Sequence, residues 1–338
     1  MAKKPPPQAI MYSLIMGRCV SHLIYVASKL ELADHLKHGP RTVEELATAA
    51  EVQAPALYRV LRTLASFGIF AETNDKRFKL TPLAVTLQKA APNSMHAAAL
   101  LWEDKFSEDA WAQLLHGLKT GEIPFLKAHG VPTFEHLEKH PETLKIFGET
   151  MTNVSSTENP AIAAAYKFSG IRTLVDVGGG NGSLLATILK ANPKLRGVLF
   201  DLASVSARAK QDRHVTAKGI AEHCTLESGN FFEAVPKGSD AYIMKRVLHD
   251  WDDERCAKIL ANCRAAMNGK GRVLVVDSVI PPGNGPDRDK LIDMQMLIMG
   301  GRERTKQEFA TVFKKAGLKL TRVVPTKCPL SIVEGVRA

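Results

Sequence analysis

The chain has 338 residues, 45% of them hydrophobic, which is enough for more than one globular domain. We see no run of about eighteen uncharged apolar residues, so we expect a cytoplasmic protein without a membrane partner. The net charge of +10 would suit nucleic acid, but the Lys and Arg residues are dispersed and aromatic residues make up only 6%. The five cysteines are scattered without a Cys-x-x-Cys pair, so we expect neither disulfides nor a metal.

The N-terminal part of the chain is predicted to be helical. Residues 10–37 carry apolar side chains at helical spacing and therefore need an apolar partner. Residues 41–64 are typical of two helices joined by a turn.

A short β-wing is predicted to follow, formed by residues 67–71 and 77–80, and together with the preceding helices it makes a winged-helix pattern. In one interpretation, the second helix binds DNA, with Arg59 and Arg62 directed towards phosphates. In the other, the winged helix is a scaffold for dimerisation, because a fold alone does not assign a function.

Residues 93–166 are again helical in pattern and rich in aromatic side chains. Aromatic residues at helical spacing most often pack in a core. Phe147 and Met151 are one turn apart and therefore lie on one face of their helix.

A glycine-rich loop separates a predicted buried strand, residues 174–177, from a predicted helix that includes residues 184–189. Its glycines are Gly178, Gly179, Gly180 and Gly182. Glycine permits a sharp turn and lets a ligand approach the main chain and the N-terminus of the next helix. The glycines are bunched rather than spaced as G-x-G-x-x-G, which argues against a dinucleotide.

Strands and helices are predicted to alternate from residue 170 to residue 323, the pattern of a doubly wound α/β sheet. The next strand, residues 197–201, ends in Asp201, which is placed either to accept hydrogen bonds from ribose hydroxyls or to cap the following helix. Further central strands are predicted at residues 240–244 and 272–276.

His249 lies a few residues after one of these strands, at the edge where open α/β sheets bind ligands. Histidine is the side chain best suited to take a proton near neutral pH. The alternative is a capping or solvated residue, because His-Asp-Trp-Asp-Asp-Glu is also a plausible helix start.

Four motifs then occur in a familiar order: residues 176–182, 200–202, 245–251 and 300–305. In these motifs the chain resembles the S-adenosylmethionine-dependent O-methyltransferases of the caffeate, hydroxyindole and bacterial polyketide type. Four motifs in order are far more specific than any one of them.

The resemblance implies a fold and an assembly. Residues 1–95 correspond to a helical, winged-helix dimerisation domain, and residues 96–165 to a helical segment that contributes to the acceptor pocket. Residues 166–338 correspond to a Rossmann-like, doubly wound methyltransferase domain. The implied assembly is a homodimer whose N-terminal helices interlock.

The resemblance also implies that S-adenosylmethionine binds at the glycine loop and leaves as S-adenosylhomocysteine, without a metal. The implied cofactor-binding residues are Asp176, Gly178, Gly179, Gly180, Gly182, Asp201, Leu202, Asn230, Phe231 and Lys245. Lys245 is alternatively an ordinary exposed lysine at a strand end. Asn230 replaces the aspartate that the family usually has near the adenine, and Ala203 replaces a proline.

The implied catalytic group consists of His249 as the general base, with Asp277 and Glu303 as its acidic partners. Asp277 stands where plant members of the family have glutamate. Its shorter side chain leaves Glu303 as the main orienting residue if Asp277 does not reach the imidazole.

Four further residues are assigned to the acceptor. By resemblance, Phe147 and Met151 line the aromatic pocket. Asp250 either contacts a second hydroxyl of the acceptor or caps a helix, and Trp251 either forms a wall of the site or packs in the core.

The leading hypothesis is methyl transfer to a hydroxyl of a small aromatic acceptor, phenolic or polyketide-like. One alternative is a cofactor-sensing, DNA-binding regulator, suggested by the winged helix and the basic charge. The other is a protein of the same fold with non-methylating chemistry.

Overall fold

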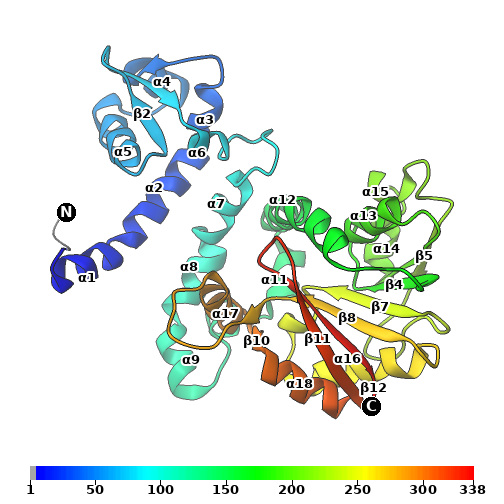
Figure 1. Ribbon diagram of the computed structural model, residues 1–338. Coiled ribbons are helices and arrows are strands. Elements are labelled where there is room, and N and C mark those ends of the chain that lie inside the picture. Colours follow the sequence, from blue (N-terminus) through cyan, green and yellow to red (C-terminus); the bar gives the residue numbers. More distant parts are fainter. Residues whose placement is uncertain (1–4) are drawn as a thin grey trace. The chain divides into compact units, whose positions relative to one another are not determined.

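Figure 1 shows a computed structural model of the protein, which describes residues 5–338. The chain forms two compact units. The first comprises Met1–Ala112 and Val131–Val154, and the second comprises Gln113–Gly130 and Ser155–Ala338. The predicted domain 1–95, apart from its four undescribed residues, lies in the first unit and the predicted domain 166–338 in the second. The predicted intermediate segment 96–165 is divided between them.

The first unit is mostly helical. Its helices begin at recognisable signals: Thr42 and Glu45 form a capping box at the start of α4, and Pro55 stands in the first turn of α5. In chain order the elements are α1 (Pro7–Ile15), α2 (Gly17–Lys29), α3 (Leu32–His35), β1 (Arg41–Thr42), α4 (Val43–Ala49), α5 (Ala54–Ser66), β2 (Phe70–Glu72), β3 (Arg77–Leu80), α6 (Pro82–Val85), α7 (His96–Trp102), α8 (Lys105–Ala112), α11 (Thr133–Lys139) and the first part of α12 (Pro141–Ala165).

The predicted winged helix is confirmed in this unit. The strands form a small antiparallel sheet in the order β1-β3-β2, and α4 and α5 are the paired helices. Leu61 and Leu64 of α5 pack with Phe70 and Phe78 of the wing in one buried cluster. The apolar spacing of α5 therefore serves the core of the unit, while its Arg59 is exposed.

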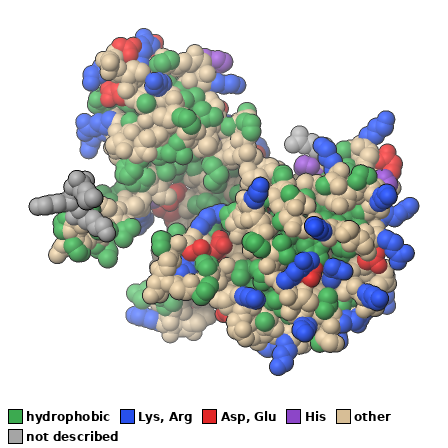
Figure 2. All heavy atoms as spheres, viewed as in Figure 1, with side chains coloured by type: hydrophobic (Ala, Val, Ile, Leu, Met, Phe, Trp, Pro, Cys, Tyr) green, Lys and Arg blue, Asp and Glu red, His purple; other side chains and the backbone are tan. Residues whose placement is uncertain are grey.

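Helix α1 has no buried residue. Its apolar side chains include Met11, Tyr12, Leu14 and Ile15, each more than half exposed, and Figure 2 shows apolar side chains at the surface there. The helical stretch Pro7–Lys29 is long and apolar enough to cross a membrane by length and composition alone. The expectation from the sequence considered only uncharged runs, and the charged Arg18 divides this stretch.

The second unit contains a large sheet with helices on both faces (Figure 1). Before the sheet come α9 (Leu114–Thr120), α10 (Pro124–His129) and the remainder of α12. The sheet and its helices comprise β4 (Thr173–Val177), α13 (Ser183–Ala191), β5 (Arg196–Asp201), α14 (Ala203–Ala209), α15 (Arg213–Thr216), β6 (Cys224–Ser228), β7 (Ala241–Lys245), the 3-10 helix η1 (Leu248–Asp250), α16 (Asp253–Ala266), β8 (Arg272–Asp277), β9 (Val279–Ile280), α17 (Arg288–Met299), β10 (Arg304–Thr305), α18 (Lys306–Lys315), β11 (Leu318–Pro325) and β12 (Ser331–Arg337).

The strand order of the large sheet is β11-β12-β8-β7-β4-β5-β6. Strands β8, β7, β4, β5 and β6 are parallel, which confirms the predicted doubly wound sheet. The final pair departs from the predicted alternation, because β12 is antiparallel to both β8 and β11. The sheet order reverses on either side of β4, and ligands of open α/β sheets bind at such a point.

Side chains of the central strands alternate between two buried clusters. In β7, Ala241 and Ile243 belong to the cluster that includes α13, whereas Tyr242 and Met244 belong to the cluster that includes α16 and α18. Both faces of the sheet are therefore covered, as expected for a parallel sheet. Only residues at the strand ends remain available for a ligand.

Candidate functional site

The glycine loop follows β4 and leads into α13. Gly178, Gly180 and Gly182 all have positive φ angles, of 68°, 58° and 76°. The space around Gly179 is closed as well, because a Cβ atom there would lie 2.4 Å from a methyl of Leu199. The loop thus requires glycine for its backbone conformation and for its close packing.

Asp201, at the end of β5, binds this loop. Its Oδ2 atom accepts a hydrogen bond from the Gly180 N–H at 2.9 Å, and its Oδ1 atom accepts one from the Leu202 N–H at 2.7 Å. Leu202 is the N-cap residue of α14, and no side chain caps that helix. The capping interpretation of Asp201 was therefore wrong.

Asp176 lies beneath the loop and is 1% exposed. Neither of its carboxylate oxygens has a hydrogen-bonding partner among the described residues. Burial raises the pKa of Asp176 to about 7, against the attraction of Lys245. A buried acceptor without a partner is costly, and a ligand that donates hydrogen bonds would lower that cost.

Lys245, the last residue of β7, is tied to α12. Its side chain is 11% exposed, and its Nζ atom donates to Ser155 Oγ at 2.7 Å and to Asn159 Oδ1 at 2.9 Å. Asn159 in turn donates to Ser183 Oγ, at the start of α13, at 3.1 Å. The alternative of an exposed strand-end lysine was wrong, since Lys245 joins the loop, β7 and α12.

Asn230 and Phe231 follow β6. The Asn230 side chain accepts from the Phe232 N–H at 3.0 Å and donates to Glu233 Oε1 at 3.2 Å, so its amide is used within its own turn. Phe231 is half-buried, with its ring 3.7 Å from the Cβ position of Gly178. Leu202 is 53% exposed.

His249 lies in η1, between β7 and α16, and is 9% exposed. Its Nδ1 atom is 2.9 Å from Glu303 Oε1, and its Nε2 atom is 3.6 Å from Asp250 Oδ1. Glu303 therefore fixes one ring nitrogen by a hydrogen bond. Nε2 has no such bond within the described residues and is the nitrogen available for proton transfer.

Asp277, at the end of β8, is 1% exposed and makes no hydrogen bond with His249. Its two oxygens lack hydrogen-bonding partners within the described part of the chain. Burial raises the pKa of Asp277 to about 7, although His249 favours the ionised form. Of the two acids, only Glu303 hydrogen-bonds with the imidazole, whereas Asp277 affects it through its charge.

The charge state of His249 follows from this surrounding. Burial by itself would lower the pKa of His249, but Asp250, Glu303 and Asp277 outweigh burial and raise it to about 9. Burial also raises the pKa of Asp250. The acidic residues therefore make His249 a stronger base than an ordinary histidine.

Asp252 is the N-cap of α16, which follows η1, and its side chain accepts from the Arg255 N–H. The capping interpretations of His249 and Asp250 were therefore wrong. Trp251 packs edge-to-face on Phe232, with ring centroids 4.9 Å apart, in agreement with the core-packing alternative.

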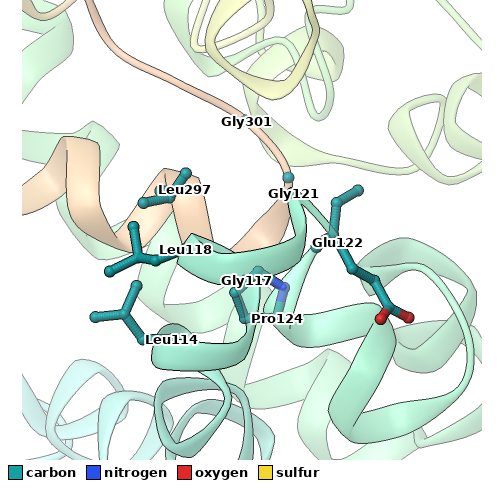
Figure 3. A pocket seen from close by; sticks show the side chains of 10 residues that line it. Leu114, Gly117, Leu118, Gly121, Glu122, Pro124, Leu297 and Gly301 are labelled. Carbon is teal, nitrogen blue, oxygen red and sulfur yellow. The ribbon is translucent and has the colours of Figure 1, made fainter.

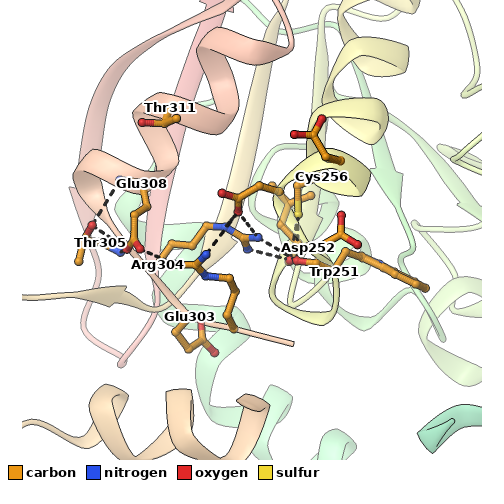
Figure 4. A network of polar contacts seen from close by, with 12 residues as sticks. Trp251, Asp252, Cys256, Glu303, Arg304, Thr305, Glu308 and Thr311 are labelled. Atoms are coloured by element: carbon orange, nitrogen blue, oxygen red, sulfur yellow. Dashed lines mark hydrogen bonds and ion pairs between the residues drawn. The ribbon is translucent and has the colours of Figure 1, made fainter. Parts of the chain in front are cut away.

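Two residues that the sequence analysis did not single out hold the His249 segment. Arg304 is 1% exposed and donates to the carbonyl oxygens of Leu248 at 3.0 Å and Trp251 at 2.8 Å (Figure 4). Gly301 lies against His249, because a Cβ atom there would be 2.2 Å from the His249 carbonyl oxygen. Both belong to the same motif as Glu303, which is the signal that could have revealed them.

A groove lies on α9, α10 and α17, next to this motif. Its volume is about 190 Å³, and Figure 3 shows apolar side chains of Leu114, Leu118 and Leu297 beside it. Gly300 and Gly301 complete its lining on one side. Phe147 and Met151 lie on α12 in the first unit, where both are half-buried, and their assignment to the acceptor pocket stays a prediction.

One group of side chains in the first unit has the composition of a metal site: His22, Glu103 and Glu108. His22 Nδ1 is 2.8 Å from Glu103, and His22 Nε2 is 3.2 Å from Glu108. Arg18 also reaches Glu108 at 3.4 Å. These contacts form an ion-pair cluster in which the two ring nitrogens of His22 face different carboxylates.

The parallel sheet, the glycine loop and the acid at the end of β5 define an S-adenosylmethionine-dependent methyltransferase fold. The family model of the O-methyltransferase domain matches residues 111–319, and that of the O-methyltransferase dimerisation domain matches residues 12–90. The chain therefore belongs to the O-methyltransferase family, as the motifs predicted. The dimerisation match covers the winged helix and supports its interpretation as a scaffold.

Individual relatives agree with this assignment. The chain is 41% identical to a phenazine O-methyltransferase from Lysobacter antibioticus, over 97% of this chain and 96% of that one. The structure is similar to that of a calicheamicin-biosynthesis methyltransferase bound to S-adenosylhomocysteine, with a TM-score of 0.89 and 36% identity over 99% and 100% of the two chains. A neocarzinostatin-biosynthesis O-methyltransferase, bound to S-adenosylhomocysteine and 1,4-dihydroxy-2-naphthoic acid, has a TM-score of 0.78 and 30% identity over 94% and 96%.

Proposed function

We propose that the protein methylates a hydroxyl of a small aromatic acceptor, with His249 as the general base. The observation that carries this proposal is the hydrogen bond from His249 to Glu303, which leaves Nε2 without a hydrogen bond, next to the ligand-binding edge of the sheet. The aromatic acceptor class is supported by two relatives: one is named a phenazine O-methyltransferase, and the other has 1,4-dihydroxy-2-naphthoic acid bound in its structure.

The glycine loop and its neighbours fit the methyl donor. S-adenosylmethionine, when bound, supplies a methyl group on a positively charged sulfur. Asp201 would accept hydrogen bonds from the ribose hydroxyls, and the unpartnered carboxyl of Asp176 lies beneath the loop, while Leu202, Asn230 and Phe231 would line the adenine end. Lys245 holds the loop and α12 together from the end of β7.

His249 accepts the acceptor's hydroxyl proton at Nε2 while Glu303 keeps the ring in place. A phenol has a pKa of about 10, so an ordinary histidine at about 6.5 would take its proton only at a cost of several kcal/mol. Raising the pKa of His249 to about 9 removes most of that difference for the neutral imidazole, which is the minor form in the unliganded protein at neutral pH. Asp250, whose Oδ1 atom is 3.6 Å from His249 Nε2, is placed to contact a second hydroxyl of the acceptor.

The base is tested by His249→Gln. We expect methyl transfer to a panel of phenols and hydroxyquinones to fall by about 100-fold or more, which is the usual contribution of a general base. His223→Gln is the control, because His223 lies outside the site. Undiminished turnover in the His249 variant, with S-adenosylhomocysteine formed as before, would refute the base.

We also propose a homodimer formed through the exposed face of α1. The dimerisation match begins at residue 12, within this helix. Leu14→Glu combined with Ile15→Glu should convert the dimer to a monomer in sedimentation experiments, because both side chains are about two-thirds exposed. Ala217→Glu combined with Ala221→Glu, at two exposed positions in the second unit, is the charge-matched control. An unchanged dimer in the double variant would contradict this interface.

A further inference from the structure

Glu158 of α12 and Arg246, the residue after β7, form an ion pair that has no assigned role. Glu158 is 2% exposed and faces the end of β7. Its Oε1 atom is 2.5 Å from Arg246 Nη2, and its Oε2 atom is 3.4 Å from Arg246 Nε. This is the two-pronged geometry in which Arg binds a carboxylate most strongly.

Arg246 is the point at which the chain leaves β7 towards His249. Its φ angle is 55°, in the left-handed region that non-glycine residues rarely occupy. Its N–H donates to the Val276 carbonyl oxygen at 3.1 Å, which ties this backbone to β8. Together with the side-chain bonds to Glu158, this contact holds a strained turn three residues before His249.

The charged groups around the imidazole come from several elements. Glu303 and Asp250 face its two nitrogens, and Asp277 lies at the end of β8. Arg246 is near these carboxylates. Its positive charge lowers the pKa of both Asp277 and Asp250, which favours their ionised forms. The other nearby charged residues are Glu158, Lys245, Asp289, Asp293 and Arg304.

We infer that Glu158 and Arg246 are positioning residues of the reaction: their ion pair fixes the turn that carries His249 and sets the charge balance around its ring. The inference rests on the proposed role of His249 as the base. The positive charge of Arg246 offsets the negative charge of the acidic residues around His249. Glu158 partly neutralises Arg246 and so weakens this effect. The pair thereby determines at which pH His249 is neutral and able to accept a proton.

Two charge-removing variants test the inference, because they move the His249 titration in opposite directions. Glu158→Gln removes a negative charge and lowers the titration midpoint, whereas Arg246→Met removes a positive charge and raises it. Each shift should be about one pH unit. The midpoint is read by NMR of the isotope-labelled histidine rings, with His249→Gln to assign the signal, and the pH profile of kcat/KM should move in parallel.

Glu334→Gln is the matched control. Glu334 is also a buried carboxylate paired with an arginine, Arg322, but it lies on β12. Its replacement should lower the melting temperature without moving the His249 midpoint. Glu158→Asp keeps the negative charge, so its His249 titration midpoint should lie much closer to that of the unchanged protein than the midpoint of Glu158→Gln does.

The outcomes separate this inference from the proposed function. Shifts in the same direction, or no shift in folded Glu158→Gln and Arg246→Met proteins, would overturn the role of the pair. Should Glu158→Gln not fold, the direction of the Arg246→Met shift alone decides. The NMR midpoint requires no turnover, so failure of every acceptor would count against the proposed function and not against the ion pair.

Discussion

The carbonyl oxygen of His249 lies only 2.2 Å from the position that a Cβ atom on Gly301 would occupy. The Arg302 N–H donates to the same oxygen at 2.8 Å, so the segment that carries Glu303 is pressed against the segment that carries His249. The relative position of His249, the proposed base, and Glu303 is thus fixed by main-chain packing as well as by their own hydrogen bond.

Gly301→Ala should disturb this packing. The added methyl must push the two segments apart, which costs on the order of 1–3 kcal/mol and displaces Glu303 from His249. We expect kcat to fall by about tenfold or more, with little change in the affinity for S-adenosylmethionine measured by calorimetry. Gly285→Ala is the control, because nothing lies within 4 Å of its Cβ position. Equal activities of the two variants would contradict the packing argument.

Glu303→Gln and Asp277→Asn should differ in their effects. Only Glu303 contacts the ring, so its replacement should lower kcat by about 100-fold. Asp277 is buried without a hydrogen bond, and removal of its charge relieves a desolvation cost. Asp277→Asn should therefore melt at the same or a higher temperature above pH 7. A larger loss of kcat in Asp277→Asn than in Glu303→Gln would reverse the assignment.

The thermal stability of the unliganded protein should fall as pH rises from 5 to 9. The pKa of Asp176 and Asp277 rises from 3.8 to about 7 in the fold, so both bind protons more tightly when folded, and stability is lost between about pH 4 and 7. The pKa of His249 rises from 6.5 to about 9, so its contribution is complete below 6.5 and lost through pH 9. Differential scanning fluorimetry should show this decline.

The same experiment on His249→Gln isolates the upper part of the curve. The variant should show a flatter dependence of melting temperature on pH between 7 and 9, because the contribution of His249 to the slope is gone. Glu334 does not contribute to the slope, since its lowered pKa of about 2 keeps it ionised throughout. A melting temperature that rises with pH would show that the charges around His249 are wrongly assigned.

Asp201→Ala should weaken cofactor binding. The substitution removes the hydrogen bond to Gly180 and the proposed acceptor for the ribose hydroxyls, so Kd should rise by about tenfold or more. Asp212→Ala is a useful comparison, because Asp212 caps α15 and its loss costs about 1 kcal/mol of stability. Calorimetric titration should find that Asp212→Ala binds the cofactor with an unchanged Kd. A similar weakening in both variants would point to general loosening of the unit.

Much of the site was predictable from sequence because each part has a local signal. The glycine loop, Asp201 and His249 all follow buried strands, so strand prediction alone places them at one edge of the sheet. The winged helix was predictable for a similar reason, since its helices and wing are adjacent in the chain.

Other parts depend on contacts between distant residues. Glu158 and Arg246 are 88 positions apart in the chain, and no periodic pattern marks a residue for such a partner. Strand β12 was missed because its antiparallel pairing with β8 breaks the alternation that the preceding elements follow. Arg304 belongs to the same motif as Glu303, but its burial and its bonds to the Leu248 and Trp251 carbonyl oxygens appear only in the structure.

The carboxylates around His249 have a further consequence for turnover. With a pKa of about 9, the imidazole of the unliganded enzyme carries a proton at neutral pH. The positive charge of the methyl donor repels this proton. The effect is reciprocal: a bound donor weakens proton binding by His249, and the proton weakens donor binding by the same factor. The product S-adenosylhomocysteine has no charge at sulfur, so its binding is not weakened by the proton on His249. Acidification should therefore favour the product over the donor, and product inhibition should become stronger as pH falls.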